Sequence, residues 1–134
     1  IGGGENHRFG LYDMIMLKDN HIDFCGSITK AITNVKQYLK NTDKDLKIIV
    51  EARSLVEIEE ILSCDGVFRI LIDNFSLKDT VKAVKMIGDK CLTESSGKID
   101  ETTVRKYAEC GVNYISSGAL THSVHNMDLS LKAV

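Results

Sequence analysis

The chain has no marked excess of either charge and no long apolar run, and each absence removes a class of function. It contains 17 lysine and arginine residues against 19 aspartate and glutamate residues, a formal net charge of −2. Such a balance provides no electrostatic footprint for nucleic acid or an anionic membrane. No apolar run approaches the roughly 20 residues that a membrane-spanning helix needs. We therefore expect neither nucleic acid nor membrane as a partner, and we expect local groups to hold any anionic ligand.

Closely spaced cysteines are missing as well. The four cysteines stand at positions 25, 64, 91 and 110, and without a C-x-x-C pair they favour reduced thiols in a cytoplasmic protein. Neither a signal peptide nor a lipidation motif is recognisable. Proline is absent, for no physical reason that the sequence offers. Because the first residue is Ile1 and not methionine, we expect the 134 residues to be part of a longer chain.

Apolar runs alternate with amphipathic segments throughout the chain, whose 43% of hydrophobic residues is typical of one globular domain. The runs predict strands at 14–17, 47–50, 70–72, 90–93 and 114–116. Helical periodicity predicts helices at 27–39, 56–62, 77–87 and 101–110, the last one closed by Gly111. This alternation favours an α/β fold with parallel strands and right-handed crossovers. Glu51, Asp73, Ser95 and Ser117 follow at intervals of 22 residues, a repeat that suits a (β/α) barrel.

Polar residues stand at the ends of five predicted strands. They are Lys18, Glu51, Asp73, the turn Ser95-Ser96-Gly97 and the turn Ser117-Gly118. In a (β/α) barrel the carboxyl ends of the strands open on one face, where active sites are built. Each residue alone could simply terminate a strand. A set that combines one cation, two carboxylates and two small turns indicates a site at the barrel mouth.

The chemistry of these residues suits an anionic, phosphorylated sugar. Lys18 can pair with an anionic substrate. Glu51 and Asp73 can hold ribose hydroxyls, coordinate Mg²⁺, or stabilise positive charge at a sugar carbon. Backbone N–H groups at the two serine-glycine turns can bind phosphate without a basic residue.

A glycine run, Gly2-Gly3-Gly4, comes shortly before His7 and Arg8. Arg8 can bind a carboxylate through two parallel hydrogen bonds, and His7 can donate to a second acid group, although a flexible loop explains the glycines equally well. Neither G-x-G-x-x-G after a strand nor a P-loop is present. We expect a structural role for His21. His122 and His125 lack the partners of a zinc site.

These blocks together resemble the quinolinate phosphoribosyltransferase family, also called carboxylating nicotinate-nucleotide pyrophosphorylases. The similarity is carried by Gly2-Gly3-Gly4-x-Asn6-His7-Arg8-x-Gly10-Leu11-x-Asp13, Lys18-Asp19-Asn20-His21, Val50-Glu51, Ile70-Leu71-Ile72-Asp73-Asn74, Glu94-Ser95-Ser96-Gly97, Ile115-Ser116-x-Gly118-x-Leu120-Thr121-His122-Ser123 and Asp128-x-Ser130-Leu131. The blocks occur in the family's order and span nearly the whole chain. In two places the chain departs from the family pattern, with Ile49 where an acidic residue is common and Lys98 where a second glycine is usual.

The resemblance implies a reaction and roles for residues. Quinolinate attacks C1 of 5-phosphoribosyl 1-pyrophosphate, pyrophosphate leaves with Mg²⁺, and CO₂ is lost to give nicotinate mononucleotide for NAD biosynthesis. By position, His7, Arg8 and Lys18 would contact the quinolinate carboxylates. Glu51 and Asp73 would contact the ribose and Mg²⁺, and together with Lys18 they form the expected catalytic set. The phosphate would be contacted by Ser96, Gly97, Ser117 and Gly118.

The resemblance also implies what surrounds the chain. Residues 1–134 would form an incomplete TIM-like (β/α) barrel. The family's amino-terminal sandwich domain and the Thr-Arg-Lys-Thr segment upstream would not be among these residues. A neighbouring subunit of a homodimer would complete the site, so we expect little activity from these residues alone. Two other functions stay open: a phosphoribosyltransferase for another ring acid such as nicotinate, and a ligand-binding relative without activity. The cations His7, Arg8 and Lys18 favour a diacid.

Overall fold

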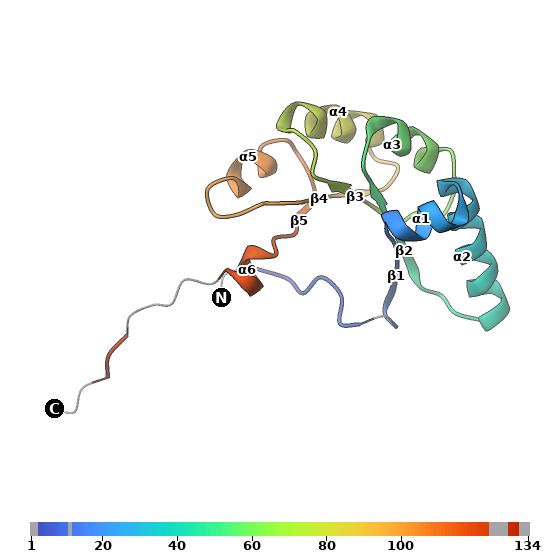
Figure 1. Cartoon of the computed structure of the whole chain (residues 1–134), viewed down its shortest axis with the longest axis horizontal. Coiled ribbons are helices and arrows are strands. Elements are labelled where there is room, and N and C mark those ends of the chain that lie inside the picture. Colours follow the sequence, from blue (N-terminus) through green and yellow to red (C-terminus); the bar gives the residue numbers. More distant parts are fainter. Residues whose placement is uncertain (1–2, 11, 124–128, 132–134) are drawn as a thin grey trace.

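The computed structural model describes residues 3–10, 12–123 and 129–131 (Figure 1). Its five strands form one parallel sheet in the order β1-β2-β3-β4-β5. The strands are β1 (Met14–Leu17), β2 (Lys47–Ala52), β3 (Arg69–Asp73), β4 (Leu92–Ser96) and β5 (Tyr114–Ile115). Each strand pairs with the next one along the chain, as in a barrel, and within the described residues no pairing of β1 with β5 closes the sheet. The expected incomplete (β/α) barrel is confirmed.

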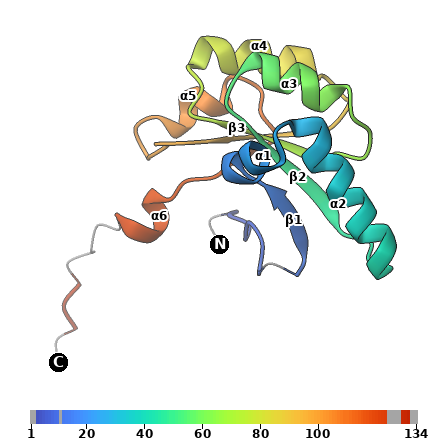
Figure 2. The same cartoon turned by 45° about the vertical axis from the view of Figure 1, so that its right-hand side comes forward.

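In the described part of the chain, six helices connect and follow the strands. They are α1 (Asp19–Cys25), α2 (Ile28–Thr42), α3 (Leu55–Leu62), α4 (Leu77–Ile87), α5 (Val104–Ala108) and α6 (Ala119–His122). The helices α2, α3 and α4 cover one face of the sheet, whereas the segment before β1 runs along the other side (Figures 1 and 2). None of the helices in the described ranges has the length and apolar character needed to cross a bilayer.

The hydrophobic core lies between the sheet and its helices. Side chains of a strand alternate between the two faces, and one face of β2 and β3 contributes Ile48, Val50, Ala52, Ile70 and Ile72 to the core. They pack in one cluster with buried helix residues that include Ile32, Ile58, Ala83 and Ile87. Burial of one such isoleucine contributes about 1.5–3 kcal/mol. This face of the sheet therefore holds the fold together, and the opposite face is left for other groups.

Serine caps fix where three of the helices begin. The hydroxyl oxygens of Ser27, Ser54 and Ser76 accept hydrogen bonds from the backbone N–H three residues later, at the starts of α2, α3 and α4. Such a cap is typically worth about 1 kcal/mol. The caps of α3 and α4 follow β2 and β3 within three residues, so the loops at the carboxyl edge of the sheet are short and well defined.

Most predicted elements are confirmed, with changes at their ends. The strand at 14–17 and the helix at 77–87 have the expected bounds. β2 continues to Ala52 and β4 to Ser96, so Glu51 and Ser95 lie inside their strands and not after them. The predicted helix at 101–110 was too long, because α5 covers Val104–Ala108 only; Gly111 follows with a φ of 88°. The helices α1 and α6 were not predicted.

Candidate active site

Charged side chains gather on the face of the sheet that turns away from the helices. The strand register places Glu51 beside Leu71, Leu71 beside Glu94, and Glu94 beside Tyr114. Because paired residues of parallel strands point to the same side, these four form one row across the inner face. Asp73 pairs with Ser96, one step closer to the carboxyl ends of the strands. The inner face thus carries carboxylates where the outer face carries isoleucine and valine.

Lys18, Glu51 and Asp73 share the carboxyl end of this face. Lys18 directly follows Leu17, which pairs with Val50, so it lies next to Glu51 across the two strands. Burial raises the pKa of Glu51, and the negative charges of Asp73 and Asp19 raise it further, while the ammonium of Lys18 acts in the opposite direction. Three acidic groups and one cation therefore act on one another at the barrel mouth. The structure brings the expected catalytic set together.

The helix α1 holds Lys18 and Asp19 at this mouth. Lys18 is the N-cap of α1, and its backbone N–H donates to Nδ1 of His21 at 3.0 Å. The expected structural role of His21 is confirmed by this contact.

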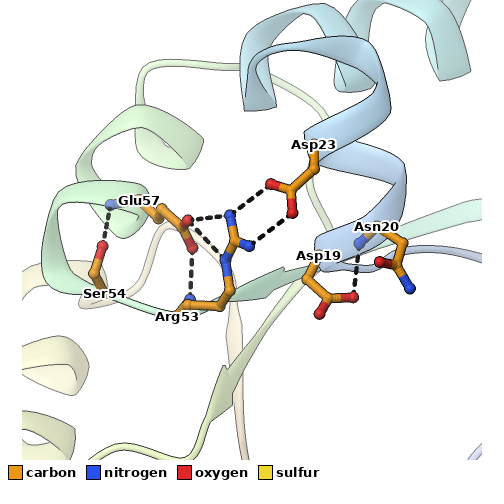
Figure 3. A network of polar contacts seen from close by, with 6 residues as sticks. All are labelled: Asp19, Asn20, Asp23, Arg53, Ser54 and Glu57. Carbon is orange, nitrogen blue, oxygen red and sulfur yellow. Dashed lines mark hydrogen bonds and ion pairs between the residues drawn. The ribbon is translucent and has the colours of Figure 1, made fainter.

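An arginine after β2 ties α1 to α3 (Figure 3). Nη1 and Nη2 of Arg53 lie 3.2 and 3.0 Å from the two carboxylate oxygens of Asp23 in α1. Nε and Nη2 also donate to Oε1 of Glu57 in α3, at 3.0 and 2.8 Å. Because Arg53 stands two residues after Glu51, this network fixes α1 relative to the end of β2.

A hollow of about 350 Å³ opens near this network, between the starts of α3 and α4. It is lined by Arg53, Ser54, Leu55, Val56, Asn74, Phe75, Ser76 and Asp79. None of these is a predicted site residue, and its most basic member already binds two carboxylates. The charged inner face, and not this hollow, is the better candidate for the site.

A buried charged pair, Arg69 and Glu94, lies in the middle of the inner face, and the sequence alone gave neither residue a role in the site. Glu94 is only 1% exposed, and its Oε2 lies 2.7 Å from Nη1 of Arg69, which is buried too. The guanidinium carbon of Arg69 lies 4.1 Å from the ring centre of Tyr114. The other oxygen of Glu94, Oε1, lies 3.0 Å from Nε2 of His7. The only signal was that Arg69 and Glu94 directly flank the predicted strands at 70–72 and 90–93.

The turns after β3 and β4 are packed in direct contact. Gly97 has a φ of 96°, and a Cβ added there would come within 2.6 Å of the side chain of Asn74 and 2.7 Å of its backbone nitrogen. The backbone N–H of Asn74 donates to the carbonyl of Ser96, and its Nδ2 donates to Asp73 at 2.9 Å. Only glycine fits at position 97, and Asn74 orients the carboxylate of Asp73.

The remaining predicted site residues are placed differently. The Ser117 hydroxyl donates to the carbonyl of Ile99, so it ties the end of β5 to the loop after β4, and Gly118 is the N-cap of α6. Nη1 of Arg8 lies 3.5 Å from the carbonyl of Met14, at the opposite end of β1 from Lys18. His7 reaches the inner face, whereas Arg8 does not join the group at the mouth. Gly2 and His125 lie outside the described residues.

Comparisons with known proteins agree with this architecture. A family model described as "Quinolinate phosphoribosyl transferase, C-terminal domain" matches residues 1–132. A decarboxylating quinolinate phosphoribosyltransferase of Nicotiana tabacum is 42% identical over 98% of this chain and 42% of its own length. The chloroplastic carboxylating nicotinate-nucleotide pyrophosphorylase of Arabidopsis thaliana is 44% identical over the same shares. The crystal structure of NadC from Streptococcus pyogenes superposes with a TM-score of 0.87 and 42% identity, over 98% of this chain and 45% of that one. The chain thus spans less than half the length of these relatives.

Proposed function

The chain belongs to the quinolinate phosphoribosyl transferase family, and from this membership we propose that it forms the catalytic barrel of an enzyme that transfers a phosphoribosyl group to quinolinate. The donor is 5-phosphoribosyl 1-pyrophosphate, and the products are nicotinate mononucleotide, pyrophosphate and CO₂, in NAD biosynthesis. The observation that carries the proposal is the common position of Lys18, Glu51 and Asp73 at one end of the inner face. The names of the relatives give the substrate class.

The charges of the site suit the two halves of this reaction. Lys18 and His7 bring basic groups to the inner face for the two carboxylates of quinolinate, and two basic groups match a diacid better than a monoacid. The ring nitrogen attacks C1 of the sugar while the bond from C1 to pyrophosphate breaks, so positive charge develops at C1. Fixed carboxylates such as Glu51 and Asp73 stabilise that charge most in the transition state.

We include Mg²⁺ in the proposal as the ion that accompanies pyrophosphate. Mg²⁺ is commonly bound by one or two protein carboxylates together with substrate phosphates. The pair Glu51 and Asp73 fits this pattern, since burial and then the negative charges of Asp73 and Asp19 raise the pKa of Glu51, and a cation would offset those charges. A self-contained protein cage does not fit, because no cluster of three metal-binding side chains occurs among the described residues. The ion would offset charge on the leaving pyrophosphate.

The assembly and location are proposals of the same kind. We expect a homodimer or a higher homo-oligomer in which the partner adds cations to the site, because the described part of the inner face has few cations for two anionic substrates. All four cysteines are free in the structure, which suits a reducing compartment such as the cytoplasm. The Arabidopsis relative is named as chloroplastic and one Nicotiana tabacum relative as mitochondrial, so the compartment differs among relatives.

The proposal is tested with the variant Lys18→Ala, made in the natural polypeptide that contains these residues. We expect turnover of quinolinate to fall by about 10² or more, since a charge-stabilising group removed from a catalytic site typically costs that much. Pyrophosphate release measures turnover, and circular dichroism measures retention of the fold. Lys82→Ala on α4 is the matched control, because Lys82 pairs with Asp79 on the helical side.

Wild-type kinetics of Lys18→Ala would show that Lys18 has no role in the reaction. Preference of the wild-type protein for nicotinate over quinolinate would favour a phosphoribosyltransferase for another ring acid. Binding of both substrates without pyrophosphate release would favour a ligand-binding relative without activity.

A further inference from the structure

The carboxylate of Glu94 is buried on the face of the sheet that carries the site, and stability alone does not explain it. A buried ion pair loses so much hydration that apolar residues of similar size are often as stable or more so. Glu94 is 1% exposed, and its partner Arg69 is also buried. Neither Nε of Arg69 nor Oε1 of Glu94 makes a hydrogen bond in the described part of the chain, and Oε1 meets His7 only at ion-pair distance. Burying this cluster therefore costs free energy of hydration that apolar residues at the same positions would not cost.

The two oxygens of Glu94 face different partners. Oε2 binds Nη1 of Arg69 at 2.7 Å, and the aromatic ring of Tyr114 lies against the guanidinium, so Arg69 is held on both sides. Oε1 is left for Nε2 of His7 at 3.0 Å. A carboxylate that is fixed at one oxygen presents the other oxygen at a defined place. Arg69 and Tyr114 thus orient Glu94 toward His7.

His7 depends on this contact more than a strand residue would. It belongs to residues 3–10, which form no strand or helix. The other polar contacts of this segment, as far as the structure describes it, go to Asp13 and Met14 near β1. The contact between His7 and Glu94 is thus the polar contact that fixes the segment over the middle strands of the sheet.

We propose that Glu94 is a positioning residue that orients His7 for quinolinate. The inference rests on the proposed function, and within it names the group that places one of the diacid-binding side chains. With Nε2 turned toward Glu94, Nδ1 is the ring nitrogen that remains for a substrate carboxylate. Glu94 and the substrate carboxylate would then face the two different nitrogens of the ring.

The experiment is a double-mutant cycle in the natural polypeptide, with Glu94→Gln, His7→Ala and the double variant. Glutamine keeps the size of Glu94 and an acceptor for Arg69 but removes the charge. We expect Glu94→Gln to weaken quinolinate binding about tenfold, in both the Michaelis constant and the calorimetric dissociation constant, because a His7 that is no longer oriented loses its hydrogen bond to the substrate. The Michaelis constant for the phosphoribosyl donor and the turnover number should stay within about twofold. In the His7→Ala background, Glu94→Gln should weaken quinolinate binding no further.

An equal effect of Glu94→Gln in both backgrounds would overturn the inference, because Glu94 would then act independently of His7. Unchanged quinolinate affinity in folded Glu94→Gln would overturn it too. If Glu94→Gln does not fold, Arg69→Met/Glu94→Gln removes both charges and should show the same loss of quinolinate affinity. Glu109→Gln, an exposed carboxylate paired with Arg105, is the matched control and should bind quinolinate normally. If the wild-type protein releases no pyrophosphate, the proposed function is rejected. If the wild-type protein turns over quinolinate and Glu94→Gln binds quinolinate with unchanged affinity, only this inference is rejected.

Discussion

The two faces of the sheet differ in chemistry although alternate residues of the same strands build them. In β3, Ile70 and Ile72 enter the core under the helices, while Arg69, Leu71 and Asp73 point to the inner face. The outer face is apolar in β2 and β3 and adds only the uncharged Thr93 and Ser95 from β4, whereas the inner face carries ion pairs and carboxylates. In such a strand, alternate residues pack in the core, and the residues between them carry the polar groups of the site. Stability and activity should therefore be separable by mutation.

The largest expected effect is on the outer face. Ile72→Ala should reduce the free energy of unfolding by about 2–5 kcal/mol, because Ile72 is fully buried and the truncation leaves a cavity. Urea unfolding of the natural polypeptide measures the loss. Val56→Ala is the control, since Val56 is 73% exposed and should cost less than about 0.5 kcal/mol. The folded fraction of Ile72→Ala should bind quinolinate with wild-type affinity. A large loss of affinity without a loss of stability would mean that the two faces are not separable.

A smaller effect, with a defined sign, is expected at Glu51 on the inner face. The folded pKa of Glu51 is raised above its ordinary value of 4.5. A carboxyl group of this kind contributes most to stability below the unfolded pKa, and the contribution is lost as pH rises through the folded pKa. Glutamine does not ionise. Glu51→Gln should therefore gain stability relative to wild type as pH rises from about 4.5 to neutrality, and it should lose turnover as well.

Urea unfolding at several pH values, without Mg²⁺, measures this difference. If the variant instead became relatively less stable toward neutral pH, the carboxylate of Glu51 would be stabilised in the fold, and the inner face would not hold the excess negative charge described above.

The elements that sequence predicted well are those whose signal is local. The helix α4 repeats apolar residues on one side and starts at a serine cap, so both its position and its ends could be predicted. The end of β2 could not, because Ala52 belongs to the strand through its pairing with Ile72. α1 was missed since only Ile22 of its seven residues is buried. α5 begins late because Asp100 accepts hydrogen bonds from the backbone N–H groups of Thr102 and Thr103 and holds a turn there.

The same distinction applies to the site. Lys18, Glu51 and Asp73 could be grouped from sequence because parallel strands bring their carboxyl ends together. The cluster of Arg69, Glu94 and His7 could not, since it depends on strand register and on the course of a segment without secondary structure. Arg8 shows the limit most clearly, because its neighbour His7 reaches the inner face while Arg8 contacts the amino end of β1.

The smallest expected effect concerns the carboxyl edge of the sheet, where Arg53 joins α1 to α3 (Figure 3). Its side chain is 40% exposed, and exposed ion pairs rarely contribute more than about 1 kcal/mol, so Arg53→Ala should change the free energy of unfolding little. Because Asp23 belongs to the helix that begins after Lys18, the variant should instead lower kcat/KM for quinolinate a few-fold. Arg105→Ala is the matched control, as Arg105 pairs with Glu109 within α5 and its flank, far in sequence from Lys18. Equal kinetics of the two variants would mean that packing of Ile22, and not Arg53, holds α1 in place. If Arg53→Ala lowered the free energy of unfolding by several kcal/mol, the network of Arg53 would stabilise the fold in the way that the outer face does.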